Sequence, residues 1–591
     1  MHPTNSAPEE SPINARKALA LVFLAATLVY AGTLSGGFTN WDDPAYVVNN
    51  PDLPLTTAGQ WKSALTSARV GTVGPVQILS YALDYQIWGL RPTGYHLTNV
   101  LLHGLCAVLL WILVRDLSGR NGAATLAALA FALHPTGAEV VSWVAERKTL
   151  LCAVFLLAAL LAYLRAEGSQ GAGMGSLCVV FFGLGVGSKI AITPLPVLLL
   201  ALHRTTGLRV TRPRVVAWIL CLALAVLFGV INLRAHAQEQ AIHGFFGHTL
   251  GAHARMVAVV VGRYVTKVFF PTRLCAYYDF VEWNMTAPRM ALGALSLGLA
   301  LAATLLLLVR RRRSGFWAAG AWLFWLPASS LLVPISTPMA DRYLYLPLLF
   351  LAPLTATAIP AWIDRRRTRQ AALLASSGLL FLASLTMHES TFWASSKQLW
   401  AHAAQVEPAN PWVRQKLAYT YWKEGDLPSA LREARLSVRI NPHWLEGWET
   451  LGQVALDAGR PQEAEGAFRQ QIGLAQNVAS AYVGIARARA ARGEKQAALA
   501  AYGEALRLRA DYQEAAKRLT ALAREKGIAR EALAVLPTSP TSVWVELARG
   551  DLLERLGRQD EAMRVWRRIL VTRPDFAPAR DRMARAAHPP L

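Results

Sequence analysis

Long apolar stretches alternate with short basic segments over the first two thirds of the chain. An apolar stretch of about 20 residues is long enough to cross a bilayer as a helix. Two stretches interrupted by charges, 76–88 and 252–270, are better explained as helices lying in the membrane interface. Eleven crossings are predicted, at 18–34, 95–113, 123–141, 149–164, 174–187, 190–202, 215–233, 290–309, 316–333, 343–362 and 371–387. A cleaved signal peptide is the alternative for the first stretch, which we interpret as a retained helix.

A 34-residue period replaces this pattern from about residue 408. Small residues at fixed positions with this spacing are typical of tetratricopeptide repeats, in which paired helices stack into a solenoid that binds peptides. The fourth unit, 519–536, is degenerate. We therefore expect a membrane domain over 1–390, a linker over 391–407 and a repeat domain over 408–591. The positions that carry the period are Ala430, Ala464, Ala498 and Ala532, with Leu417, Leu451, Ile485 and Leu519.

Composition supports a membrane protein with a water-exposed C-terminal part. Hydrophobic residues make up 53% of the 591 positions and charged residues 17%, and the mean hydropathy is +0.28. Only 47 charged residues lie in residues 1–400, whereas 51 lie in the last 191. These values exclude an intrinsically disordered chain, a fibrous protein and a disulfide scaffold. The five cysteines form no CxxC motif and no cluster at metal-ligand spacing, so no metal site is expected.

The basic residues predict the orientation of the membrane domain. The net charge is +22, and its densest runs, 310–313 and 365–369, directly follow apolar stretches. Such runs stay on the cytoplasmic side of a membrane, so they are not explained as a nucleic-acid surface. With the N-terminus cytoplasmic, eleven crossings place the repeat domain outside the cytoplasm. We expect a multi-pass protein of the cytoplasmic membrane.

Two adjacent carboxylates, Asp42 and Asp43, follow Trp41 in the first predicted external loop. Like charges in contact raise one of the two pKa values, which suits a proton acceptor near neutral pH. Pro44 predicts an extended conformation for Asp43. The alternative is an interfacial turn in which Trp41 anchors the loop and Asp42 caps a helix.

Further ionisable residues gather at the predicted outer edge of the membrane. Such residues are costly at this depth, so they are functional or paired. The alternative for the first group is an interfacial anchor formed by Glu146 and Arg147, and for the second a pair between Asp341 and Arg342. Asp279 is a weaker candidate. The candidates for binding a phosphate or a substrate are Glu139, Arg147 and Lys148, then Lys189, then Asp341, Arg342 and Tyr343.

Five ordered segments resemble the transmembrane and tetratricopeptide-repeat-containing protein family and its bacterial relatives. They are Trp41-Asp42-Asp43, Leu83–His103, His134–Leu151, Asp341–Pro347 and the C-terminal repeats. Two positions depart from the pattern of the relatives: Gly74-Pro75 stands where Arg-Pro is common, and Thr136-Gly137 where Val-His is often found. The first departure removes a possible phosphate ligand.

The resemblance implies an all-α protein with a C-type glycosyltransferase fold followed by a tetratricopeptide α-solenoid. It also implies transfer of a sugar, mannose or another hexose, from a polyprenyl-phosphate donor to Ser or Thr hydroxyls of proteins on the outer face of the membrane. Asp42 and Asp43 match the paired acidic residues of the family. A divalent cation is possible in this chemistry but is not required. The rival hypothesis is a non-enzymatic membrane scaffold whose repeats recruit envelope proteins, and a transporter is a third.

Overall fold

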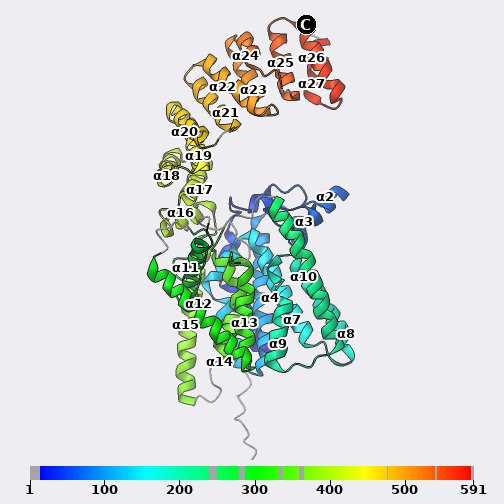
Figure 1. The fold of residues 1–591 in the computed structure, drawn as a ribbon, viewed down its shortest axis with the longest axis vertical. Coiled ribbons are helices and arrows are strands. Elements are labelled where there is room, and N and C mark those ends of the chain that lie inside the picture. The colour runs from blue at the N-terminus through cyan, green and yellow to red at the C-terminus, as the bar shows by residue number, and fades with distance from the viewer. Residues whose placement is uncertain are drawn as a thin grey trace, which may run out of the picture. The chain divides into compact units, whose positions relative to one another are not determined.

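The computed structural model describes residues 14–238, 249–278, 286–331, 337–358, 365–475, 477–539 and 542–587. The chain divides into two compact units, Met1–Glu407 and Pro408–Leu591. Both units are helical (Figure 1). The β pairing recorded among the described residues is an isolated bridge between Arg69 and Thr72, so the predicted all-α class is confirmed.

The first unit holds sixteen of the described helices. Among them α4, α7, α8 and α10 pack side by side, and α1 packs against α4 (Figure 1). Their bounds are α1 Ala15–Leu28, α2 Ala58–Thr66, α3 Pro75–Trp88, α4 Pro92–Ser118, α5 Asn121–Ala132, α6 Ala138–Ser142, α7 Arg147–Leu164, α8 Gly171–Val186, α9 Leu195–Thr206, α10 Arg212–Gln238, α11 Leu250–Phe269, α12 Ala287–Val309, α13 Ser314–Trp325, α14 Tyr345–Ala358, α15 Arg365–Thr391 and α16 Ser396–Val406.

Seven helical segments of the described chain are long and apolar enough to cross a membrane. The protein is therefore a multi-pass membrane protein. Helix α11, with its three basic residues, is not among the seven. They are Ala15–Ser35, Pro92–Ser118, Val144–Leu164, Gly168–Val186, Arg212–Arg234, Ala287–Val309 and Gln370–Thr391.

Fewer segments pass this test than the eleven crossings predicted. The segment 121–142 is broken, because its two helical parts meet at an angle of 54°, and it counts as an eighth only if both parts form one span. Helices α9 and α13 have 12 residues each and α14 has 14, which is shorter than a full crossing. The C-terminal ends of the predicted spans 316–333 and 343–362 lie outside the described residues. The count of eleven stays a prediction.

The segment 391–407, which the sequence predicts as a linker, includes a helix. Residues Ser396–Val406 form helix α16, which the Ser395 side chain caps. Trp400 is fully buried, and its indole Nε1 donates a 2.6 Å hydrogen bond to Asn40 in the first unit. The backbone N–H of Asn40 in turn donates to Ser396. Because the segment contains many polar residues, its sequence did not predict this helix, which packs through one buried face.

The second unit consists of helix pairs joined by short turns. A glycine with positive φ closes successive turns at Gly425, Gly459, Gly493 and Gly527, each 34 residues after the last, and again at Gly557. Only glycine adopts this left-handed conformation without strain. The degenerate fourth unit has a second helix, α24, of 7 residues in place of 14. The bounds are α17 Pro411–Lys423, α18 Leu427–Ile440, α19 Leu445–Asp457, α20 Pro461–Leu474, α21 Ala479–Ala491, α22 Lys495–Leu508, α23 Gln513–Lys526, α24 Ala529–Val535, α25 Val543–Arg555, α26 Gln559–Thr572 and α27 Ala577–Ala587.

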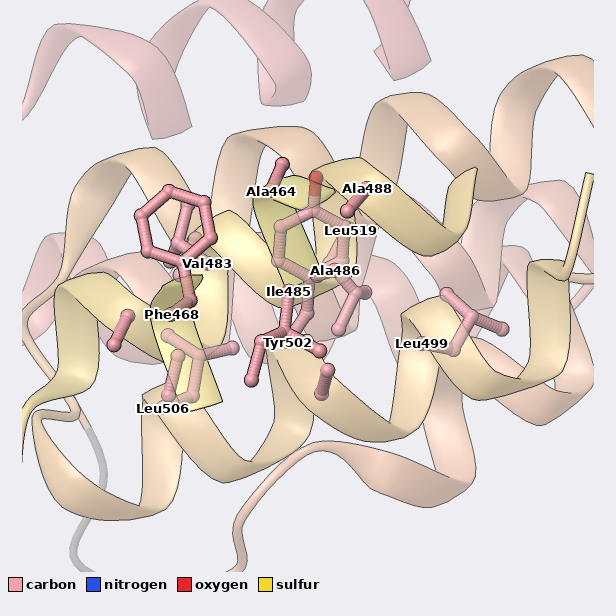
Figure 2. Close-up of a cluster of buried hydrophobic side chains, with 14 of the residues drawn as sticks. Ala464, Phe468, Val483, Ile485, Ala486, Ala488, Leu499, Tyr502, Leu506 and Leu519 are labelled. Carbon is pink, nitrogen blue, oxygen red and sulfur yellow. The ribbon is translucent and has the colours of Figure 1, made fainter. Parts of the chain in front are cut away.

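Close helix packing in this unit depends on small residues that face aromatic rings. Figure 2 shows the buried Phe468 ring beside Val483, within the cluster that includes Ile485 and Leu506. A Cβ built on Gly484 would lie 2.4 Å from this ring, and one on Gly452 would lie 2.6 Å from it. These glycines leave the space that the ring fills, which explains the small residues of the repeat.

We expect Gly484→Ala to destabilise the repeat unit by about 1–3 kcal/mol, because the added methyl group overpacks the core against Phe468. The matched control is Gly466→Ala, since nothing lies within 4 Å of a Cβ at that exposed helical position. The control should stabilise the unit by about 0.5–1 kcal/mol through helix propensity. Scanning calorimetry of the full chain in nanodiscs measures both. Equal shifts for the two variants would contradict this account of the packing.

Candidate functional site

A break in the helix between α5 and α7 forms the centre of the candidate site. Helix α5 ends at Ala132, and the chain continues through a 3-10 turn at Pro135–Gly137, the short helix α6 and a second 3-10 turn at Val144–Glu146. Pro135 lacks a backbone N–H, so the regular helix cannot continue through it. The break places Glu139 in the short helix α6 and Glu146 in the 3-10 turn directly before α7.

Side chains from other elements satisfy the backbone of this break. The Ala145 N–H donates to the Asp43 carboxylate at 2.9 Å, and Gln77 Nε2 donates to the Ala145 carbonyl at 3.1 Å. The Tyr81 hydroxyl donates to the Val144 carbonyl at 2.8 Å. Irregular backbone persists at membrane depth only with such partners. The loop 36–43 and α3 therefore hold the break in place.

Three cationic side chains surround the Glu146 carboxylate. The distances from Glu146 are 3.2 Å to Lys189 Nζ, 3.5 Å to Lys148 Nζ and 3.6 Å to Arg342 Nε. Glu146 is almost fully buried, whereas the side chains of Lys148, Lys189 and Arg342 keep 14%, 20% and 10% exposure. Lys189 also donates to Thr149 at 2.7 Å, and Thr149 donates to Glu146. One buried acid thus gathers three cations that remain accessible.

Arg342 is held in a fixed position by an acid and two indoles. Its Nη1 lies 2.5 Å from Glu139, and its backbone N–H donates to the same carboxylate at 2.8 Å. The guanidinium carbon lies 5.6 Å from the ring centroids of both Trp41 and Trp143, within the range of cation–π attraction. Trp41 and Trp143 stack with centroids 4.4 Å apart. This arrangement joins the loop 36–43 to the Asp341–Leu344 turn.

The two adjacent aspartates occupy different environments. Asp43 is fully buried, and its carboxylate accepts hydrogen bonds from the Thr39 N–H at 2.8 Å, the Thr39 hydroxyl at 3.0 Å and the Ala145 N–H. Burial raises the pKa of Asp43 to about 7 against the opposing effect of these donors. Asp42 is only partly buried and interacts electrostatically with Lys148. Asp42 is therefore the more accessible carboxylate.

The predicted extended conformation of Asp43 is wrong. Its backbone is helical, with φ −56° and ψ −36°, and Pro44 begins a short π-helical turn, Pro44–Val48. The Asp42 carbonyl accepts the Ala45 and Tyr46 N–H groups of this turn. The hydrogen bonds to the Asp43 carboxylate and this turn together outweigh the local bias that a following proline imposes.

Arg147 does not face the cluster as the sequence predicts. Its guanidinium is fully buried and donates to Asn99 Oδ1 at 2.8 Å and to the carbonyls of Tyr95 and Ser80. It also forms an ion pair of 2.5 Å with Asp84. Because all three nitrogens have protein partners, a phosphate could bind Arg147 only by displacing them. Arg147 fixes α7 to α3 and α4.

The Asp341 carboxylate is likewise bound by other groups of the protein. It accepts hydrogen bonds from the Tyr278 hydroxyl at 2.8 Å and the Cys275 N–H at 2.9 Å, and Lys267 Nζ lies 3.9 Å away. The pKa of Asp341 is raised by burial, with Lys267 opposing the shift. Its side chain thus contacts the segment after α11 while Arg342 contacts Glu139.

Of the remaining predicted residues, Tyr343 lies beside Arg342, whose guanidinium carbon is 5.0 Å from the ring centroid. Asp279 lies outside the described residues. The described chain contains no group of three or more His, Cys, Asp or Glu side chains arranged to hold a metal ion.

The sequence leaves Glu146 between a functional role and an anchor pair with Arg147, and its place at the centre of three cations is not predicted. The signal that could have found it is the run Glu146-Arg147-Lys148, in which adjacent residues of opposite charge begin a helix and must point to different sides. The buried acid Asp84, which pairs with Arg147, was missed as well. Its position in an apolar helix was the available signal.

We expect Asp43 to make the stability of the first unit depend on pH. An ordinary aspartate titrates at about 3.9, so raising the pH removes the proton from the unfolded chain first. The contribution of a protonated, buried Asp43 is complete below pH ~4 and is lost as the pH rises to about 7. Asp43→Asn should flatten the fall of the thermal midpoint between these limits. Asp42→Asn is the matched control, and identical pH profiles for Asp43→Asn and the unmodified protein would contradict the assignment.

Comparisons with known proteins identify distant relatives of this chain. The human protein O-mannosyl-transferase TMTC3 is 22% identical over 568 residues, which cover 84% of this chain and 61% of the human protein. Human TMTC4 is 25% identical over 475 residues, covering 69% and 64%. Xenopus laevis tmtc2 is 34% identical over 158 residues, 26% of this chain and 19% of that protein. The chain thus spans about three fifths of the length of the curated relatives that it matches over most of its own length.

Among solved structures, ArnT from Cupriavidus metallidurans bound to undecaprenyl phosphate has 17% identity, covers 76% of this chain and 80% of its own, and gives a TM-score of 0.35. The MamA protein has 21% identity over 31% of this chain and 96% of its own, with a TM-score of 0.23. No protein-family model matches. The chain is distantly related in sequence to the TMTC protein O-mannosyl-transferases.

Proposed function

We propose that the protein is a membrane glycosyltransferase that moves a hexose from a polyprenyl-phosphate donor to a Ser or Thr hydroxyl of a protein. The observation that carries this proposal is the convergence of Lys148, Lys189 and Arg342 on Glu146, beside the accessible Asp42. The distant relationship to protein O-mannosyl-transferases supports the reaction type. Mannose is the sugar suggested by the names of these relatives.

The three cations would bind the donor phosphate. Their partly exposed ends offer charge-assisted hydrogen bonds, and the acids that hold them are buried. Cations placed in advance stabilise the negative charge that develops on a leaving group without costly rearrangement. Arg342 is the most rigidly placed of the three, because Glu139, Trp41 and Trp143 fix it.

Asp42 would act as the general base. It takes the proton of the acceptor hydroxyl while that oxygen forms a bond to the anomeric carbon of the sugar. The bond from this carbon to the phosphate oxygen breaks, and its electrons leave with the polyprenyl phosphate. Asp43 would position Asp42, because its carboxylate ties the loop to the backbone before α7. The repeat unit would hold the acceptor protein.

The two aspartates are expected to differ when replaced singly. Asp42→Asn should lower kcat by ~10²–10⁴-fold, since loss of a general base has this effect. Asp43→Asn should lower kcat less, and it should also lower the thermal midpoint because an amide cannot accept all three hydrogen bonds. The assay is sugar transfer by purified protein in nanodiscs. Full activity of the double variant would return the scaffold hypothesis to first place.

Removing a cation should weaken donor binding and transfer together. We expect Lys189→Met to raise KM for the lipid donor and lower kcat, because Lys189 would contact the phosphate of the bound donor and would stabilise it more strongly as negative charge develops on the leaving group. The matched control is Lys62→Met, an exposed lysine of α2. If Lys189→Met behaves as the control does, the phosphate site lies elsewhere.

The proposal includes the orientation of the chain: the site and the repeat unit face the outside of the cytoplasmic membrane. The basic runs at 310–313 and 365–369 support it. An alkaline phosphatase fused after Leu591 should therefore be active, and a cytoplasmic reporter at the same position should be silent. The reverse result would overturn the orientation.

A further inference from the structure

A polar cavity of the repeat unit lies between α23 and α25, the first helices of its last two helix pairs, and α27, the helix that follows them. The cavity measures about 410 Å³. It lies where the 34-residue period fails, because the glycines that close the turns step from Gly527 to Gly557, only 30 positions. The lining residues come from α23, α25 and α27 and include Lys517, Thr520, Arg524, Trp544, Leu547 and Arg582.

An apolar surface and a closed ion pair form two parts of this cavity. Trp544 is partly exposed beside the buried Leu547, which offers a surface for an apolar side chain. Arg582 binds the buried Asp551 with two hydrogen bonds of 3.0 Å each. Because this pair neutralises Asp551, the acid does not give the cavity a free negative charge.

Two exposed cations, Lys517 and Arg524, line the part of the cavity that α23 forms. Lys517 Nζ lies 5.3 Å from the Trp544 ring centroid. No carboxylate among the described side chains lies within 4 Å of either cation. They are seven residues apart on α23, two turns along one face, so their backbones are about 10 Å apart at 1.5 Å per residue. Asp581 is the exposed acid of the lining.

We propose that this cavity binds an acidic peptide segment in the polyproline II conformation, with two Asp or Glu residues three positions apart and an apolar side chain between them. A polyproline II helix has three residues per turn and advances about 3.1 Å per residue, so side chains three positions apart lie on the same side about 9 Å apart, close to the ~10 Å between the two cations. The acidic residues meet Lys517 and Arg524, and the apolar side chain rests on Trp544. The identification of this peptide as part of the acceptor rests on the proposed function.

The test measures peptide binding without any lipid donor, so that it is independent of sugar transfer. The full chain in nanodiscs is titrated against a fluorescein-labelled peptide of sequence pattern Asp-Leu-Leu-Asp, and anisotropy reports binding. The Lys517→Glu, Arg524→Glu double variant should bind at least about tenfold more weakly, which corresponds to ~1.4 kcal/mol. Replacing both aspartates of the peptide by asparagine should give a similar loss. Empty nanodiscs measure binding to lipid.

The matched control is Arg564→Glu, Arg568→Glu, which makes the same charge change on α26, where both side chains are exposed and line a different cavity. The control should bind the peptide as the unmodified protein does. Equal weakening by both double variants would overturn the proposal in favour of general attraction to a basic surface. Equal binding of the asparagine peptide would overturn it as well. Normal peptide binding in a chain that transfers no sugar would instead contradict only the proposed function.

Discussion

The interrupted helix between α5 and α7 is the constraint on which the rest of the site depends. A membrane-embedded chain must pair every backbone N–H and C=O, and the regular helix around Pro135 cannot do so. The structure pairs them through Asp43 of the loop 36–43 and through Gln77 and Tyr81 of α3. Because of the same break, Glu139 and Glu146 lie on two separate short helical turns and not on one continuous helix. A regular helix here would place these two acids two turns apart and could not aim both at Arg342.

Burial of so many charges requires that each one has a partner. Ions removed from water are tolerated when opposite charges and hydrogen bonds replace the solvent. Glu146 has Lys148, Lys189 and Arg342, and Glu139 has Arg342. Arg147 and Asp84 form a separate pair beneath the site. The charged side chains are therefore of two kinds, which differ in how completely protein partners surround them. Those with complete sets of protein partners support the fold, and those with exposed ends can meet a ligand.

The sequence predicts the helical class and the repeat unit because both depend on local periodicity. Residues Asp42, Glu139, Lys148, Lys189 and Arg342 were recognised as ionisable groups in apolar surroundings, and the structure brings them together. Partners distant in sequence could not be predicted. Arg147 lies next to Lys148 in the chain, yet it turns toward Asn99 and Asp84, which only the packing of α3 and α4 on α7 determines. Asp43 is helical for the same reason, since its carboxylate is bound by Ala145, 102 positions away. Apolar composition does not predict how long the helices α9, α13 and α14 are, so the count of crossings stays a prediction.

The charge balance of the cluster suits the transfer of one proton. Lys148, Lys189 and Arg342 face Asp42, Glu139 and Glu146, so the site is neutral before a donor phosphodiester with one negative charge enters. In the proposed reaction Asp42 would lose its charge on accepting the hydroxyl proton and the departing phosphate would gain one, so the total charge would stay the same. Only the position of the negative charge changes, from the carboxylate toward the phosphate. In surroundings of low dielectric constant, a reaction that conserves the local charge avoids the large energy of creating a new unpaired ion. Lys148 interacts with both Asp42 and Glu146, and it is therefore the cation best placed to follow this shift.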